Sequence, residues 1–167
     1  HRSFHKRYAQ DAGKGLKPGD RLVGKKQEDY VREFHAAWGD GTAETKPDID
    51  KILSMMSDDA EWQLWVPGGP VIKGQEALRK EIEQQSRVAT HNKCNEVNIL
   101  SNERMVMQER SDTAYIMGNW CPHQMVAIYE FDEDGKIAKW REYLDMADLT
   151  KKMGVSQDFA GTDELSA

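Results

Sequence analysis

Three charged side chains in the second half of the sequence could carry out acid–base chemistry. Arg110 and Asp112 are two positions apart in one alternating segment, and Glu142 lies in a later segment of the same kind. Side chains alternate between the two faces of a strand, so Arg110 and Asp112 share a face. If Glu142 faces the same way, an arginine lies between two carboxylates. Buried charges are costly unless paired, so this trio predicts a proton-transfer site.

Successive strands are needed to bring these residues together. The alternation of polar and apolar residues predicts strands at 94–100, 104–116, 123–131 and 136–144. The run Asp132-Glu133-Asp134-Gly135 is typical of a hairpin turn, so the last two strands should pair antiparallel.

A histidine could take part in the same chemistry. His123 begins the third of these strands, and alternation places it on the same, inward face as Met125. Near Asp112 and Glu142, it could act as a base or an acid around neutral pH. Alternatively, it could cap a loop after Pro122.

The first half of the sequence predicts mainly helices. Tyr30, Phe34 and Trp38 recur every four residues in a helix that should begin near Gln27. His35 lies beside that apolar face, where a packed or solvated helix histidine is the ordinary interpretation. Three further helices are predicted at 45–56, 75–88 and 146–153, and one strand is predicted at 60–66. This order predicts an α+β domain with helices on one face of a strongly bent antiparallel sheet.

The two ends of the chain differ from this central domain, predicted at 27–153. Residues 1–26 are rich in lysine, arginine and glycine without helix or strand periodicity, which predicts a basic arm. The arm could wrap the acidic surface of a neighbouring subunit or simply extend from the domain. Residues 154–167 predict a polar tail.

Charge and cysteine content narrow the functional classes. With a net charge of −6, the 167-residue chain is not expected to bind nucleic acid. No apolar run is long enough to cross a membrane. Cys94 and Cys121 lack zinc-ligand spacing, which favours free thiols in a reducing, cytoplasmic setting and no metal site.

Several segments, in a fixed order, carry a resemblance to a known family. They are Ser57-Asp58-Asp59-Ala60-Glu61-Trp62, Lys73-Gly74-Gln75-Glu76-Ala77-Leu78, Glu109-Arg110-Ser111-Asp112, Asp134-Gly135-Lys136-Ile137 and Trp140-Arg141-Glu142-Tyr143-Leu144-Asp145. Together they resemble the nuclear-transport-factor-2-like (NTF2-like) superfamily, and within it the limonene epoxide hydrolases and SnoaL-like polyketide cyclases. The resemblance implies a cone-shaped α+β fold with a strongly curved mixed or antiparallel sheet and helices on its concave side. This fold hosts hydrolases, isomerases, lyases and non-catalytic binders.

The resemblance also implies roles for the charged trio. In the epoxide hydrolases, the residue matching Asp112 protonates the epoxide, the one matching Arg110 bridges the carboxylates, and the one matching Glu142 activates water. A tyrosine and an asparagine help to hold that water, and their positions here are occupied by Trp62 and Leu64. Neither side chain can accept a hydrogen bond from water. Hydrolysis is therefore disfavoured unless Gln63 or Tyr30 substitutes, whereas proton transfer stays possible.

The expected pocket lining is apolar and aromatic. We expect the substrate-binding residues to be Trp62, Leu64, Met125, Trp140 and Tyr30. This lining favours a small hydrophobic, cyclic or aromatic substrate, although the tryptophans could merely fill the core. The leading prediction is a cofactor-independent isomerase or a lyase acting by elimination or retro-aldol cleavage, with catalytic Asp112, Arg110, Glu142 and His123. An epoxide hydrolase and a non-catalytic ligand-binding domain are the alternatives.

The resemblance further implies self-association, as a homodimer or homotrimer, because such sheets usually pair through their outer face. Tyr129, Tyr143, Met105 and Met107 are expected to supply part of that face.

Overall fold

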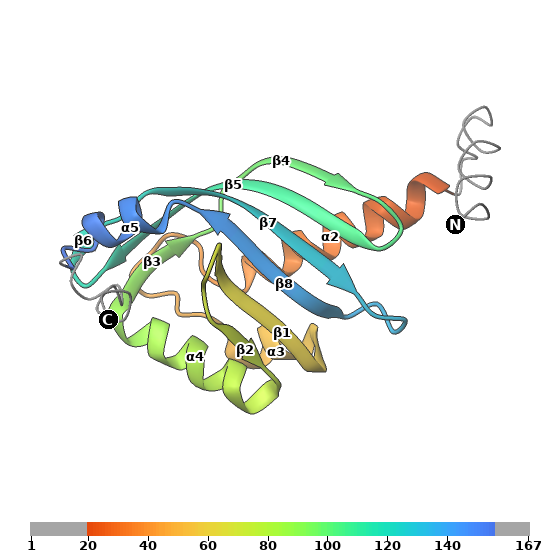
Figure 1. Ribbon diagram of the computed structural model, residues 1–167, viewed down its shortest axis with the longest axis horizontal. Helices are drawn as coiled ribbons and strands as arrows, with labels where there is room; N and C mark the ends of the chain where they lie inside the picture. The colour runs from red at the N-terminus through yellow and green to blue at the C-terminus, as the bar shows by residue number, and fades with distance from the viewer. Residues whose placement is uncertain (1–19, 156–167) are drawn as a thin grey trace, which may run out of the picture.

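The computed structural model describes residues 20–155 (Figure 1). Its helices are α2 (Asp20–Ala36), α3 (Ile49–Ser54), α4 (Gln75–Val88) and α5 (Met146–Lys152). Its strands are β1 (Met56–Val66), β2 (Val71–Lys73), β3 (Ala89–Lys93), β4 (Glu96–Ser101), β5 (Met105–Ile116), β6 (Asn119–Trp120), β7 (His123–Phe131) and β8 (Ile137–Leu144). The α+β class predicted from the sequence is confirmed.

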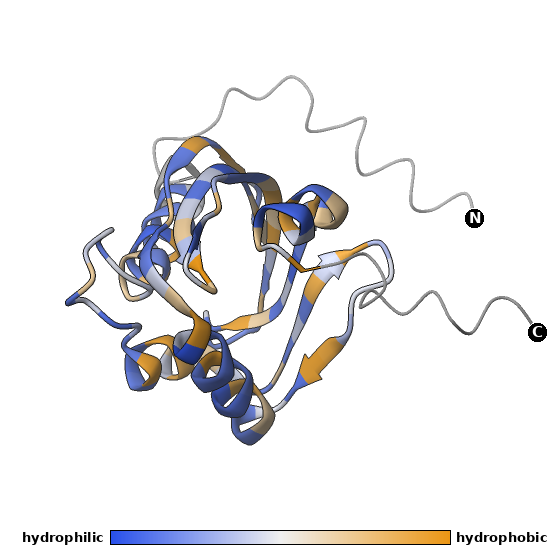
Figure 2. Ribbon diagram, turned by 90° about the vertical axis from the view of Figure 1, so that its left-hand side faces the viewer, coloured by the Kyte–Doolittle hydropathy of each residue, from blue (hydrophilic) through white to orange (hydrophobic). Residues whose placement is uncertain are grey.

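The strands form one curved, mixed sheet of eight strands. Its order is β2-β1-β8-β7-β5-β3, and β4 and β6 also pair with β5. Only the β1–β8 pairing is parallel among these strands, and every other pairing is antiparallel. Figure 1 shows the sheet curling over the helices, and Figure 2 shows that its strands carry both hydrophobic and hydrophilic residues. The curvature turns the inner faces of β1, β5, β7 and β8 toward a shared interior.

The core lies between this concave face and the helices. Helix α2 contributes Val31 and Phe34, Trp38 follows just after its end, and α4 contributes Leu78 and Ile82. These spacings place the apolar residues of each helix on one side, which buries them against the sheet. The inner face of the sheet supplies the other half of the core, with Met56, Ala60, Trp62, Val106, Ala127, Tyr129, Ile137 and Trp140.

A turn between β7 and β8 sets the register that places Glu142. The Asp132 side chain accepts hydrogen bonds from the backbone N–H groups of Asp134 (3.0 Å) and Lys136 (2.9 Å). Gly135 has φ 78°, a conformation that glycine adopts at little steric cost. The resulting pairing puts Glu142 opposite Ala127 and Trp140 opposite Tyr129.

Some predicted boundaries were wrong. Helix α2 includes residues 20–26, which were predicted to belong to a non-helical arm, and β2, β3 and β6 were not predicted. Helix α3 begins at Ile49 rather than near residue 45, because the Asp48 side chain caps it by accepting from Lys51 N. The predicted arm up to residue 19 and the predicted tail from residue 156 lie outside the described residues.

Tyr129 was also wrongly placed on the outer face of the sheet. It is fully buried on the inner face of β7. Alternation along β7 puts it on the same side as His123, Met125 and Ala127, so the pattern that turned those residues inward applied to Tyr129 as well. Met107 and Tyr143 are exposed, as expected for outer-face residues.

In the part of the chain that the structure describes, no helix has both the length and the apolar character required to cross a membrane. Within the same residues, no three histidine, cysteine or acidic side chains gather closely enough to hold a metal ion.

Candidate active site

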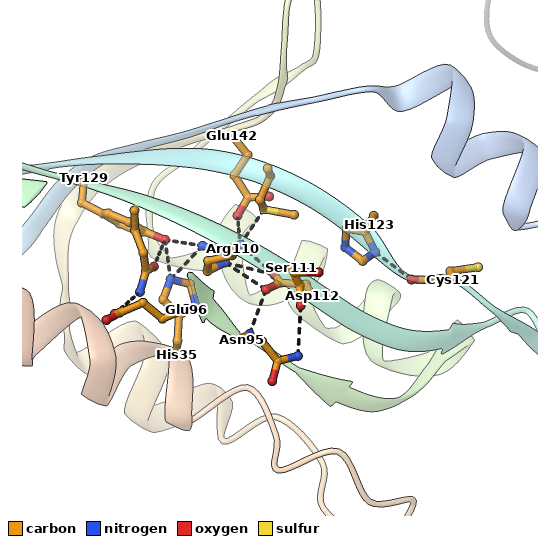
Figure 3. Close-up of polar contacts among 12 residues, drawn as sticks. His35, Asn95, Glu96, Arg110, Ser111, Asp112, Cys121, His123, Tyr129 and Glu142 are labelled. Carbon is orange, nitrogen blue, oxygen red and sulfur yellow. Dashed lines mark hydrogen bonds and ion pairs between the residues drawn. The ribbon is translucent and has the colours of Figure 1, made fainter. Parts of the chain in front are cut away.

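Arg110 stands at the centre of a buried polar cluster on the inner face of the sheet (Figure 3). Its Nη2 lies 2.9 Å from Asp112 Oδ2 and 3.0 Å from Glu142 Oε1, so one guanidinium nitrogen bridges two carboxyl groups. Asp112 follows Arg110 on β5, and Glu142 comes from β8 with β7 between them. The structure thus brings together the charged trio in the arrangement expected from strand alternation.

Asp112 is held by several donors at once. Arg110 Nε donates to both of its oxygens, at 3.2 Å and 3.0 Å, and the backbone N–H of Asn95 donates to Oδ1 at 3.2 Å. Asn95 is itself fixed, because its side-chain amide donates to the carbonyl of Ser111. These contacts hold the carboxyl group of Asp112 in one orientation.

Glu142 has a different environment. Arg110 Nη2 donates to Oε1 at 3.0 Å, without the Nε and backbone N–H donors that Asp112 has, although both residues are equally buried. Burial raises the pKa of Glu142 above its usual range, and the nearby Asp112 adds to this effect, whereas Arg110 opposes it. The two carboxyl groups therefore differ in their hydrogen-bond partners, and Glu142 is the one whose environment favours the protonated form.

The other end of the Arg110 guanidinium contacts His35 and Tyr129. Nη1 lies 2.9 Å from His35 Nε2 and donates to the Tyr129 hydroxyl, which also contacts His35 Nε2. Burial, followed by the positive charge of Arg110, holds the pKa of His35 well below its usual range, so the imidazole is neutral. Nη2 additionally contacts Met125 Sδ.

His123 lies at the start of β7, directly opposite Asp112 on β5. Its Nδ1 donates to the carbonyl of Cys121 at 2.8 Å, because a carbonyl can only accept. In the neutral ring, this bond assigns the single proton to Nδ1 and leaves the lone pair of Nε2 free to accept a proton. His123 is half-buried and lines the cavity described next.

A cavity of about 310 Å³ opens beside these groups. Four of the five side chains predicted to bind substrate line it, namely Trp62, Leu64, Met125 and Trp140. The indole rings of Trp62 and Trp140 stack with centroids 4.3 Å apart, so these residues also belong to the packed core. Helix α5 contributes Met146 and Leu149 to the opposite wall, together with Met153 just after it.

Tyr30 is not part of this cavity. Its hydroxyl donates to the carbonyl of Met55 at 2.8 Å, and the ring lies beside a separate surface depression with Lys25 and Glu33. Gln63 does not line the cavity either, since its side chain donates to the carbonyl of Gly69. Neither of the two residues considered as substitutes for the water-holding pair is therefore placed to hold a water beside the carboxyl groups.

Sequence reasoning missed several members of the polar cluster. Gln108 and Tyr129 carried a usable signal, because each has the strand parity of residues assigned to the inner face. His35 carried none, because its contact with Arg110 joins positions 75 apart in the sequence. Cys94 also lines the cavity, and burial together with the nearby Asp112 raises the pKa of its thiol, which keeps it protonated and weakly nucleophilic.

Comparisons with known proteins identify the family and the fold. The sequence model of the SnoaL-like domain matches residues 31–140. Comparison with curated proteins gives no match.

Several solved structures share the fold at low sequence identity. An epoxide hydrolase of M. tuberculosis that resembles limonene epoxide hydrolase is 20% identical, with a TM-score of 0.64 over 78% of this chain and 90% of that one. A phenazine biosynthesis-related protein from Pseudomonas aeruginosa is 14% identical, with a TM-score of 0.69 over 83% and 91%. A putative polyketide cyclase from Pseudomonas putida is 16% identical, with a TM-score of 0.63 over 75% and 96%.

At these identities the structural likeness establishes the NTF2-like fold alone, whereas the match to the sequence model covers most of the described residues. The chain therefore belongs to the SnoaL-like domain family.

Proposed function

We propose that this protein is a cofactor-independent acid–base enzyme, an isomerase or a lyase, that acts on a small hydrophobic cyclic or aromatic compound. The observation that carries the proposal is the bridging of Asp112 and Glu142 by Arg110 in the wall of an otherwise largely apolar cavity. Two carboxyl groups in unlike environments beside such a cavity suit paired proton donation and removal.

The proposed roles follow from the contacts of each group. Glu142 is the general acid, because burial raises its pKa and favours the protonated form. His123 is the general base, because its Nε2 lone pair is free while Nδ1 is bonded to the Cys121 carbonyl. Asp112 faces His123 across the strand pair, where its negative charge stabilises the imidazolium that forms. This assignment gives Glu142, rather than Asp112, the acid role that the epoxide hydrolases give to the residue matching Asp112.

The same pair of groups can serve either kind of reaction. In an elimination, His123 removes a proton from carbon, the carbon–oxygen bond breaks as a double bond forms, and Glu142 protonates the departing oxygen to give water. In a retro-aldol cleavage, His123 removes the hydroxyl proton, the carbon–carbon bond breaks as a carbonyl forms, and Glu142 protonates the carbon that leaves. In an isomerisation, the proton removed at one atom is replaced by one delivered to another. Each route leaves the oxidation balance of the substrate unchanged.

The cavity lining supports these routes over hydrolysis. Trp62 and Leu64, which the resemblance matches to the water-holding residues of the epoxide hydrolases, line the cavity, and Tyr30 and Gln63 lie elsewhere. The burial of Glu142 against Arg110 supports an enzyme over a ligand-binding domain, since a purely structural Arg110–Asp112 pair does not need a second buried carboxyl group.

A mass-spectrometric turnover screen in ¹⁸O-water tests the proposal. Wild type, Asp112→Asn and a control, Glu130→Gln, are incubated with cyclic and aryl epoxides and with aryl-substituted hydroxy ketones. Glu130 lies outside the cavity and pairs with Arg141. We expect an isomer, an alkene or a cleaved carbonyl fragment from wild type and the control, and none from Asp112→Asn despite a nearly unchanged melting temperature.

The other outcomes identify the alternatives. A diol carrying one ¹⁸O establishes an epoxide hydrolase. No turnover of any compound, with Asp112→Asn losing mainly stability, establishes the ligand-binding interpretation.

We also propose that the chain self-associates through the outer face of its sheet. Met107 on β5 and Tyr143 on β8 are exposed there, and Val126 of β7 lies opposite Tyr143 between them. Light scattering on size-fractionated protein should show a dimer or trimer that Tyr143→Lys dissociates, and a monomeric wild type contradicts this proposal.

A further inference from the structure

His35 and Tyr129 bind the side of Arg110 that faces away from the carboxyl groups (Figure 3). We propose that these two residues are positioning residues, which fix the plane of the Arg110 guanidinium so that Nη2 reaches both Asp112 and Glu142. The inference deepens the proposed function, because it concerns how that site is held in its working geometry.

The donors of Arg110 are fully used. A guanidinium has five N–H groups, one on Nε and two on each terminal nitrogen. Nε donates to Asp112, and Nη2 has Asp112, Glu142 and Met125 Sδ within reach. The two protons of Nη1 therefore depend on His35 and Tyr129, which are its acceptors. Removing either acceptor leaves a buried N–H without a partner and allows the guanidinium to turn.

Arg110 also decides where His35 carries its proton. Because Nη1 can only donate, His35 Nε2 must accept and the single proton of the neutral imidazole lies on Nδ1. The Tyr129 oxygen likewise accepts from Nη1, and its own proton faces two acceptors, His35 Nε2 and Gln108 Oε1. A protonated His35 would turn a donor toward Arg110, so the contact requires the neutral ring.

A chain of hydrogen bonds fixes Tyr129 from the opposite side. The Gln108 amide donates from Nε2 to Glu96 at 3.0 Å, which turns its oxygen Oε1 toward the Tyr129 hydroxyl at 3.3 Å. Glu96 is in turn paired with Arg32 of α2 at 2.9 Å. Arg110 Nη1 is thus connected, through Tyr129, Gln108 and Glu96, to an exposed ion pair between α2 and β4. The orientation of the Arg110 guanidinium therefore depends on how α2 packs against the sheet.

Nuclear magnetic resonance of protein labelled with ¹⁵N in arginine and histidine tests the proposal without a substrate. Arg110 is assigned by comparison with Arg110→Lys. We expect wild type to show distinct, slowly exchanging Nη1 and Nη2 signals for Arg110, and His35 to be protonated on Nδ1 only.

Matched variants separate positioning from simple packing. Tyr129→Phe and His35→Leu each remove an acceptor, and we expect the exchange of the Nη signals to speed up at least tenfold. His35→Gln keeps an acceptor oxygen and should restore slow exchange, and Tyr115→Phe removes a hydroxyl from an exposed tyrosine outside the cavity and should change nothing. A merely structural role lowers the melting temperature without changing this exchange.

Two results overturn the inference. One is a proton on His35 Nε2 in wild type. This measurement needs no variant, so it decides the question even if a variant fails to fold. The other is unchanged exchange in both Tyr129→Phe and His35→Leu. Either result leaves the acid–base proposal standing, because that proposal fails separately, if Asp112→Asn retains turnover.

Discussion

Asp112 and His123 face each other directly across the antiparallel pair of β5 and β7. Side chains opposite each other in such a pair have their Cβ atoms about 5 Å apart, so the carboxyl group of Asp112 and the imidazole of His123 belong to the same part of the inner face. The backbone carbonyl of Cys121 orients the imidazole by accepting from Nδ1. This bond leaves Nε2 for a substrate.

The first prediction concerns His123→Gln. Glutamine can still donate to the Cys121 carbonyl but is not a base at neutral pH, so turnover should fall by about 10²–10⁴-fold with little loss of stability. The measurement is the rate with any substrate found in the turnover screen. His91→Asn, outside the cavity, is the matched control. Retained turnover in His123→Gln would transfer the role of base to Asp112.

The second prediction concerns pH and Glu142. Burial raises the pKa of Glu142 in the folded protein above the ordinary value of 4.5, so between these two values the folded chain binds a proton that the unfolded chain has lost. The stabilising contribution of the protonated group is complete below about 4.5 and is lost as pH rises through the folded pKa.

Wild type should therefore lose stability relative to Glu142→Gln as pH rises through that window, by up to about 1.4 kcal/mol per pH unit. Urea unfolding of both proteins between pH 4 and 8 measures the difference. Glu130→Gln on the same sheet should show no such trend. A difference between wild type and Glu142→Gln that is constant with pH contradicts the assignment of Glu142 as a proton-holding acid.

The third prediction compares two arginines of the same sheet. Arg110→Met leaves Asp112 and Glu142 buried without their shared cation, so the free energy of unfolding should fall by about 3–5 kcal/mol. Arg141→Met breaks the half-exposed pair with Glu130 and should cost at most about 1 kcal/mol. Chemical denaturation at neutral pH measures both. Equal losses for the two variants would mean that the Arg110 cluster is reached by water.

The fourth prediction concerns the cavity. Leu64→Trp places a larger side chain in its wall and should weaken the binding of a flat bicyclic probe, 2-naphthol, at least tenfold by calorimetry. Tyr30→Phe is the control, because the Tyr30 hydroxyl bonds the Met55 carbonyl away from the cavity. A loss of affinity in Tyr30→Phe as large as in Leu64→Trp contradicts the placement of the binding site.

The fold was largely predictable because its strongest signals are local. Strand β7 has the predicted bounds, His123–Phe131, because both the alternation of polar and apolar residues and the turn that begins at Asp132 depend on residues close together in the sequence. Strand β3 was missed because its residues are polar and its pairing partner, β5, is distant in the sequence. His91 within it has φ 56°, which further departs from a regular strand pattern.

The candidate site was predictable to the same extent. Arg110, Asp112, Glu142 and His123 follow from parity within strands, so the sequence was sufficient to place them on one face. The hydrogen-bond partners that distinguish Asp112 from Glu142 come from Asn95 and from the way the two carboxyl groups share Arg110, which depend on how the chain before β4 packs against β5 and on the position of β8 beyond β7. Tyr30 failed as a pocket residue for a similar reason, because its helical position did not reveal the carbonyl that binds it.

The parallel pairing of β1 with β8 makes Trp62 and Trp140 register partners, and their indole rings lie within 2° of parallel. Two indoles this close couple their electronic transitions, and when the two transition dipoles are twisted against each other within their parallel planes the coupling gives a paired band of opposite signs in the far-ultraviolet circular dichroism spectrum. Such a band reports the pairing of the first strand with the last. Refolding followed through it would show when β1 and β8 come together, independently of the formation of the hairpins.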